Sequence, residues 1–128
     1  MESLLKNLNE AQKKAVLHKD GPLLVLAGAG AGKTKAIAHR VAYLVSQGVN
    51  PENILAITFT NKAANEMKER IMFLLKPQII NSKLQTPFVS TFHSLGAHIL
   101  RRHGKYIGIT KNFTILDKEA SLGMLKEA

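Results

Sequence analysis

The sequence predicts an α/β fold in which a parallel sheet is covered by helices on both faces. Short apolar runs alternate with stretches of helical periodicity, and this order is typical of parallel strands joined by right-handed crossovers. Each apolar run is followed by small or hydroxylated residues at the start of a helical pattern. Because ligands of such sheets bind at the carboxyl ends of the strands, we expect a site along that edge.

The first apolar run begins at Pro22 and is expected to be a buried strand. It leads into Ala-Gly-Ala-Gly-Ala-Gly-Lys-Thr, from Ala27 to Thr34, which is the P-loop pattern with Ala in the first position. Small residues let backbone amides surround a triphosphate, and the dipole of the following helix adds attraction. The residues expected to bind the nucleotide here are Ala27, Gly28, Ala29, Gly30, Ala31, Gly32, Lys33 and Thr34.

Two of these side chains are also the candidate catalytic residues. Lys33 is expected to reach the β- and γ-phosphates, and the Thr34 hydroxyl is expected to ligate Mg²⁺. The alternative is a tight turn of small residues with Lys33 in solvent. That alternative leaves unexplained why Gly-Lys-Thr stands between a strand and a helix.

Asn9 and Gln12, at the start of the first expected helix, allow two interpretations. They form the pattern of a capping box, in which the two side chains bond each other's backbone amides. Alternatively, the Gln12 carboxamide pairs with N6 and N7 of adenine, a geometry that an amide fits well. The local sequence leaves both open.

The other elements are expected from periodicity and turn residues. Val41 and Val45, with Ile37 and Leu44, should face inward from a helix over Thr34–Gln47 that Gly48 stops. Ala64, Met67, Ile71 and Leu74 should do so from a helix after Asn61. The remaining expectations are strands at Ile54–Phe59 and Phe88–Thr91, an exposed connection at Pro77–Pro87, a helix ending at Arg101–Gly104, a strand or extended segment at Phe113–Leu116, and a helix from Asp117 through Leu125. No C-cap follows, so we expect a piece of a longer protein.

The second and third strand exits predict contacts with single-stranded nucleic acid. The candidates are Phe59, Thr60, Asn61 and Lys62 at the second exit, and Thr91, Phe92 and His93 at the third. Phenyl rings can stack on bases, while hydroxyls and helix N-terminal amides can hold phosphates. Singly, the alternative of threonine caps and core phenylalanines is favoured. The two exits together, in a chain with five Phe and two Tyr, favour nucleic acid.

The composition agrees with a polyanionic partner. Of the 128 residues, 45% are hydrophobic, and 18 Lys and Arg against 9 acidic residues give a net charge of +9. There is no Cys, which excludes disulfides and thiolate metal sites. The five His lack metal-ligand spacing. Neither a run of about 20 apolar residues nor a signal peptide is present, so we expect a cytoplasmic protein.

These motifs together resemble a known family. Leu8-Asn9 with Gln12, residues 26–34, Ile-Thr-Phe-Thr-Asn-Lys-Ala-Ala at 57–64 and Ser-Thr-Phe-His-Ser at 90–94 resemble the N-terminal part of superfamily 1 DNA helicases of the UvrD/Rep/PcrA type. The resemblance implies a RecA-like P-loop NTPase fold, ATP and Mg²⁺ as cofactors, and 3′-to-5′ movement on single-stranded DNA with unwinding at duplex junctions. It also favours adenine for Gln12 and DNA contacts for both strand exits.

The resemblance has two departures. The family usually has Arg after Gly-Lys-Thr, lying against adenine, where this chain has Lys35, a poorer planar stacker. No later strand ends in the Asp-Glu pair that would hold Mg²⁺ and orient water. By the same resemblance, residues 1–110 are expected to be the first part of motor domain 1A, and residues 111–128 are expected to begin an inserted helical subdomain 1B. The isolated chain should have little or no ATPase.

Three alternatives to a UvrD-like helicase remain open from the sequence. The chain could belong to the motor subunit of a RecB/AddA-like helicase–nuclease. It could be a P-loop kinase for small molecules, which predicts an acceptor pocket and no salt-dependent DNA affinity. It could also be a noncatalytic DNA-binding module with a vestigial nucleotide site.

Overall fold

The computed structural model describes residues 2–28, 30–79 and 86–116. It divides into two compact units, Met1–Phe92 and His93–Ala128. The helix expected from Asp117 lies outside the described residues. Among the described helices, none combines the length and the apolar character that a membrane span needs.

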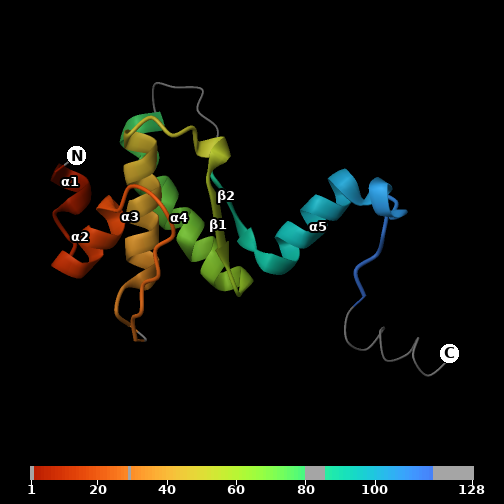
Figure 1. Ribbon diagram of the computed structural model, residues 1–128, viewed down its shortest axis with the longest axis horizontal. Coiled ribbons are helices and arrows are strands. Elements are labelled where there is room, and N and C mark those ends of the chain that lie inside the picture. Colours follow the sequence, from red (N-terminus) through yellow and green to blue (C-terminus); the bar gives the residue numbers. More distant parts are fainter. Residues whose placement is uncertain (1, 29, 80–85, 117–128) are drawn as a thin grey trace. The chain divides into compact units, whose positions relative to one another are not determined.

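The first unit is a mixed helix and strand structure with a small parallel sheet (Figure 1). The strands β1 (Leu55–Thr58) and β2 (Phe88–Thr91) pair in parallel, with Leu55 opposite Phe88 and Thr58 opposite Thr91. The helices of this unit are α1 (Glu2–Leu5), α2 (Glu10–Leu17), α3 (Lys33–Ser46) and α4 (Asn61–Ile79). Helix α5 (Phe92–His103) follows β2 directly. The expected strands at 54–59 and 88–91 are thus confirmed within a residue or two.

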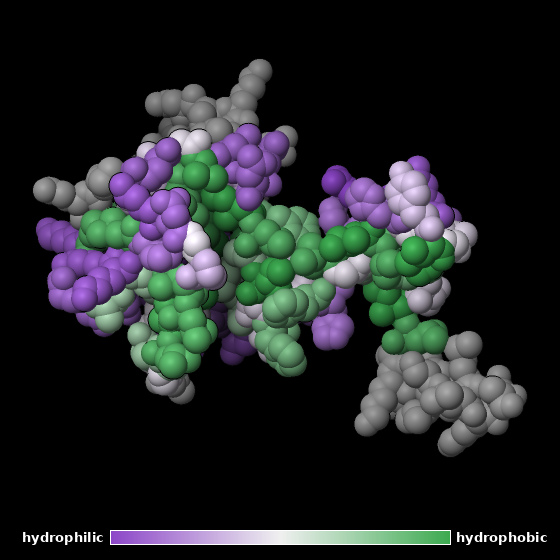
Figure 2. Space-filling view, in the orientation of Figure 1, coloured by the Kyte–Doolittle hydropathy of each residue, from purple (hydrophilic) through white to green (hydrophobic). Residues whose placement is uncertain are grey.

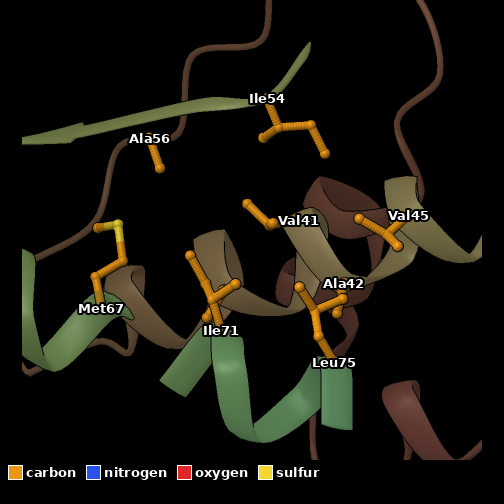
Figure 3. Close-up of a cluster of buried hydrophobic side chains, with 9 residues drawn as sticks. Val41, Ala42, Val45, Ile54, Ala56, Met67, Ile71 and Leu75 are labelled. Carbon is orange, nitrogen blue, oxygen red and sulfur yellow. The ribbon is translucent and has the colours of Figure 1, made fainter. Parts of the chain in front are cut away.

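The core of this unit lies between α3, α4 and β1 (Figure 3). Val41 and Val45 from α3 meet Ile71 and Leu75 from α4, and Ile71 and Leu75 are 1% and 0% exposed. Spacings of three and four residues put these side chains on one face of each helix, which explains why two amphipathic helices pack here. A smaller cluster of Leu8, Val16 and Tyr43 attaches α2 to the other side of α3.

The first apolar run is not a buried strand, contrary to expectation. Leu23, Leu24, Val25 and Leu26 are 44%, 81%, 47% and 86% exposed, and residues 22–28 have no regular secondary structure. Figure 2 shows hydrophobic side chains on the surface where this segment runs. A strand is held by ladder hydrogen bonds to a neighbour, and among the described residues β1 and β2 pair only with each other. The segment therefore lacks what would make it a strand.

Because the segment from Leu23 to Leu26 does not form a strand over α3, Ile37 does not face inward. Its side chain is 43% exposed and borders a cavity of about 390 Å³ together with Leu23 and Val25. A strand formed by residues 23–26 would cover the side of α3 that carries Ile37. The prediction that Ile37 is an inward-facing residue of this helix was therefore wrong.

Smaller corrections concern α4 and the segments after it. Leu75 is the fully buried residue, while Leu74 is partly buried. Helix α4 continues through Pro77 to Ile79, so the expected exposed connection does not begin at Pro77. Residues 80–85 of that connection lie outside the described residues, and Pro87 at its far end is buried. A proline removes one helical hydrogen bond, which did not end α4 there. Of the two alternatives for residues 113–116, the strand is wrong, because these residues have no regular secondary structure.

Substituting Ile71 should reveal how much the α3–α4 contact stabilises the fold. We expect Ile71→Ala to lower the free energy of unfolding by about 2–5 kcal/mol, because the side chain is buried and its removal leaves a cavity. Phe73→Ala on the same helix is the control, since Phe73 is 70% exposed, and it should change stability by about 0.5 kcal/mol or less. Urea unfolding followed by circular dichroism measures both; equal decreases in stability would contradict this description of the core.

Candidate nucleotide and nucleic-acid site

The loop before α3 has the backbone geometry of an anion-binding turn. Gly30 and Gly32 have φ angles of +75° and +79°, which residues with a Cβ rarely adopt. The loop is closed by a hydrogen bond from the Ala31 amide to the Gly28 carbonyl oxygen of 3.3 Å. No described side chain caps α3, so the amides of its first turn point toward the loop without a side-chain acceptor. Ala29 lies outside the described residues.

The Lys33 side chain lies across this loop. Its ammonium donates to the carbonyl oxygens of Ala27 and Gly28, at 2.8 and 2.6 Å. The next residue, Thr34, is half-buried in the first turn of α3. A phosphate placed at the helix N-terminus would therefore meet the ammonium after a rotation of the Lys33 side chain away from the two carbonyls.

Gln12 connects the start of α2 to the same loop. The capping box is present: the Asn9 amide donates to Gln12 Oε1 at 3.1 Å, and the Gln12 amide donates to Asn9 Oδ1 at 2.9 Å. The Gln12 Nε2 group also donates to the Ala31 carbonyl oxygen at 3.2 Å. A Cβ at Gly32 would lie 2.5 Å from Nε2, so a glycine at this position leaves space for the carboxamide. The capping interpretation is confirmed, and adenine recognition stays a prediction.

Basic side chains on α3 hold the N-terminal helices in place. The Lys35 ammonium donates to the Asn7 carbonyl oxygen. His39 is 8% exposed, and its Nδ1 lies 2.6 Å from the Leu4 carbonyl oxygen. Arg40 Nη1 donates to the carbonyl oxygens of Ala15 and His18, at 2.9 and 2.6 Å, where α2 ends. A cation at a helix C-terminus satisfies unpaired carbonyls and complements the helix dipole.

Sequence reasoning missed His39 and Arg40. Their partners lie 22 to 35 residues earlier in the chain, and the bonds are to backbone oxygens, so no side-chain pattern marks them. Lys35, which stands where the family usually has an adenine-stacking Arg and was counted among the candidate nucleotide-binding residues, donates from its ammonium to the segment between α1 and α2; its contact with a nucleotide stays a prediction.

The second and third strand exits lie side by side. The paired residues Thr58 and Thr91 end β1 and β2, and neighbouring strands are about 4.8 Å apart. Phe59 and Phe92 follow these paired residues and are 81% and 62% exposed. The alternative that both rings belong to the core is therefore wrong. We call Phe59, Thr60, Asn61, Lys62 and Phe92 the aromatic rim.

The polar residues of the two exits differ in their surroundings. Thr60 caps α4, because its Oγ1 accepts a hydrogen bond from the Ala63 amide at 3.2 Å. Asn61 and Lys62 are exposed in the first turn of α4. Thr91 is 5% exposed, which places it beneath the rim and not on it. His93 is exposed and is the first residue of the second unit.

Side chains alone do not form a metal centre in the described part of the chain. No group of three or more His, Cys, Asp or Glu residues converges there. Lys13 and Glu10 form an ion pair of 2.7 Å at the start of α2, and the Lys13 ammonium lowers the pKa of the Glu10 carboxyl. A divalent ion at Thr34 would need its other ligands from phosphate oxygens and water.

Comparisons with known proteins identify the family of this chain. The family model described as the UvrD/REP helicase N-terminal domain matches residues 8–128. The chain belongs to the UvrD/REP helicase family. It is 48% identical over 128 residues to the ATP-dependent DNA helicase PcrA of Staphylococcus epidermidis and 46% identical to PcrA of Staphylococcus aureus. Each alignment covers 99% of this chain and 17% of the relative, so the chain spans about one sixth of the length of these UvrD/REP relatives.

Removing the Arg40 guanidinium should loosen the N-terminal helices. We expect Arg40→Ala to lower the free energy of unfolding by about 1.5–3 kcal/mol, the usual contribution of hydrogen bonds to a charged group. The amides of α2 should also exchange with solvent faster, because Arg40 bonds the carbonyls at its end. Hydrogen exchange with mass spectrometry measures this, with exposed Lys14→Ala as the control. Unchanged exchange in α2 would show that Arg40 does not hold it.

Proposed function

We propose that this chain is the ATP-binding and single-strand-contacting part of a DNA helicase that moves 3′ to 5′ along single-stranded DNA and unwinds duplex junctions. The observation that carries the proposal is the pair of exposed rings, Phe59 and Phe92, at adjacent strand exits. Large exposed aromatics in a chain of charge +9 fit stacking on unpaired bases. The names of the PcrA relatives, ATP-dependent DNA helicases, support it.

The loop residues fit a nucleotide triphosphate. Positive φ angles at Gly30 and Gly32 bring the backbone close to a ligand, and a Cβ at Gly28 or Gly30 would meet no atom within 4 Å, so the loop is open there. Lys33 would exchange its two carbonyl acceptors for phosphate oxygens, and Thr34 would supply one hydroxyl to Mg²⁺. ATP, once bound, supplies the free energy for movement. These features support a RecA-like P-loop NTPase fold.

The Gln12 carboxamide would select the base. It lies next to Ala31 and Gly32 at the start of α3, on the side from which an adenine attached to a loop-bound phosphate could be reached. Lys35 would contribute positive charge near the base only by releasing the Asn7 carbonyl. We therefore assign Gln12 the larger share of adenine recognition.

The aromatic rim would hold the DNA strand. Phe59 and Phe92 would stack on bases, and Asn61, Lys62 and the amides of the first turn of α4 would contact phosphates. Thr60 and Thr91 would keep the rim in shape, one by capping α4 and the other from within the core. His93 would add a contact from the start of α5.

Hydrolysis requires parts that the rest of the protein would provide. We propose that residues 1–110 belong to motor domain 1A and that 111–128 begin subdomain 1B, followed by an acidic strand end that orients water. Closing and opening of the cleft between two motor domains would then let the rim exchange its hold on successive bases. The machinery is expected in the cytoplasm, where DNA and ATP meet.

The experiment that tests this proposal removes one ring. Phe59→Ala in the full-length protein should weaken binding of a dT oligonucleotide by about 1–3 kcal/mol, or about 5- to 160-fold, because one stacking platform is removed. ATP affinity without DNA should not change. Lys33→Ala is the complementary variant: it should abolish DNA-stimulated ATP hydrolysis and leave oligonucleotide binding without nucleotide intact. Unchanged oligonucleotide affinity of Phe59→Ala would refute the rim, and full ATPase activity of Lys33→Ala would refute the nucleotide site.

A substitution at Gln12 should separate capping from base recognition. Glutamate keeps an oxygen for the Asn9 amide but replaces the donor group with an acceptor. Gln12→Glu should therefore keep the stability of α2. It should weaken ATP binding by about 2- to 12-fold, the equivalent of one lost hydrogen bond. Asn9→Ala is the matched control, because it removes the cap, at about 1 kcal/mol of stability, and leaves the carboxamide. Calorimetric titration with ATP and thermal unfolding measure the two effects; loss of ATP affinity in both variants would assign Gln12 to capping alone.

A further inference from the structure

The end of α5 and the turn after it carry a group of cations. Arg101, Arg102 and His103 occupy the last turn of α5, Lys105 lies in the 3₁₀ turn Gly104–Ile107, and all are exposed. From residue 86 through residue 116 the sequence contains no Asp or Glu. Figure 2 shows hydrophilic side chains gathered around the C-terminal half of α5. We call Arg101, Arg102 and Lys105 the basic cluster.

A tight turn holds this cluster against two aromatic rings. The Ile109 amide donates to the Gly104 carbonyl oxygen at 2.9 Å, and a Cβ at Gly104 would lie 3.1 Å from Ile109, so the chain turns back closely there. The Arg101 guanidinium carbon lies 5.3 Å from the Phe113 ring centroid. The Lys105 ammonium lies 5.0 Å from the Tyr106 centroid, and Tyr106 stacks on His103 with centroids 6.4 Å apart.

The helix dipole alone does not account for these charges. Cations in a last helical turn complement the dipole, which would explain Arg101 and Arg102. Lys105 lies beyond the helix end, as does Lys111. Since residues 93–116 contain no carboxylate, nothing within that segment neutralises the repulsion among them. Such a field attracts a polyanion.

We propose that the basic cluster binds the phosphate backbone of double-stranded DNA. The Arg101 guanidinium lies over the Phe113 ring and the Lys105 ammonium lies over the Tyr106 ring, so a ligand of this cluster meets cations directly beside the rings, although the Tyr106 side chain is 76% exposed. A duplex has the matching chemistry, because its bases are paired inside and it carries one phosphate charge per about 1.7 Å of axis. An unpaired strand, by contrast, is recognised largely through stacking.

This interaction is separate from the single-strand contacts at the strand exits. Along α5, Arg101 is about 12 Å from His93, at a rise of 1.5 Å per residue. The inference rests on the proposed function, because it takes DNA as the partner. It adds a second form of DNA to the one that the aromatic rim would hold.

The test compares two triple variants of the full-length protein with equal charge. Arg101→Gln/Arg102→Gln/Lys105→Gln removes the cluster, and Lys14→Gln/Lys19→Gln/Lys68→Gln removes three exposed cations in the first unit. Binding to a blunt duplex and to a dT oligonucleotide is measured by fluorescence anisotropy from 50 to 200 mM salt. The slope of log affinity against log salt for the duplex should become shallower by about 0.9 for each phosphate that the protein no longer neutralises, so by about 2.7 for three. The control variant should keep the original slope.

A charge-preserving variant separates electrostatics from packing. Arg101→Lys/Arg102→Lys keeps both charges and should retain the duplex slope, whereas thermal unfolding reports any weakening of the packing against Phe113. An unchanged duplex slope in the glutamine variant, or a slope equally reduced in the control, overturns the proposal. A decrease in affinity confined to the dT oligonucleotide also overturns it and assigns the cluster to the unpaired strand. If wild-type protein binds neither DNA, the proposed function itself fails.

Discussion

The structure depends on hydrogen bonds from basic side chains of α3 to backbone oxygens of the N-terminal segment. Arg40 bonds the carbonyls that end α2, and His39 bonds Leu4. Each bond satisfies a carbonyl that a short helix leaves unpaired. Because α2 has only eight residues, it would be marginal alone. Its attachment to α3 fixes the position of Gln12 relative to the glycine loop, and so the candidate nucleotide site depends on contacts made one to two helical turns beyond it.

The parallel pairing of β1 and β2 sets the second half of the site in the same way. Parallel strands end at the same edge of a sheet. Thr58 and Thr91 are the last paired residues of β1 and β2, so the residue that follows each of them lies just beyond the hydrogen-bonded pairs. Both of those residues are phenylalanine. The sheet therefore brings together two rings that are 33 residues apart in sequence, an arrangement that neither strand exit would produce alone.

Local sequence patterns predicted the helices, the paired strands and the helix cap correctly. The amphipathic faces of α3 and α4, the two paired strands and the capping box all follow from residue spacing, and all are present. The segment from Leu23 to Leu26 was wrongly expected to be buried, because an apolar run becomes a strand only through a hydrogen-bonded neighbour. Among the described strands it has none. The roles of His39 and Arg40 were beyond prediction for a related reason: backbone carbonyls carry no sequence signal.

The two interpretations of Gln12 are compatible once its hydrogen-bonding capacity is counted. A carboxamide has an oxygen with two lone pairs and a nitrogen with two hydrogens. The Asn9 amide takes one lone pair of Oε1, and the Ala31 carbonyl takes one hydrogen of Nε2. One acceptor position and one donor position remain, which is the pair that adenine N6 and N7 require. The bonds to Asn9 and Ala31 therefore orient the carboxamide without using the oxygen lone pair and the hydrogen that would bind the base. The entropy cost of ordering this side chain is then part of folding and not of nucleotide binding.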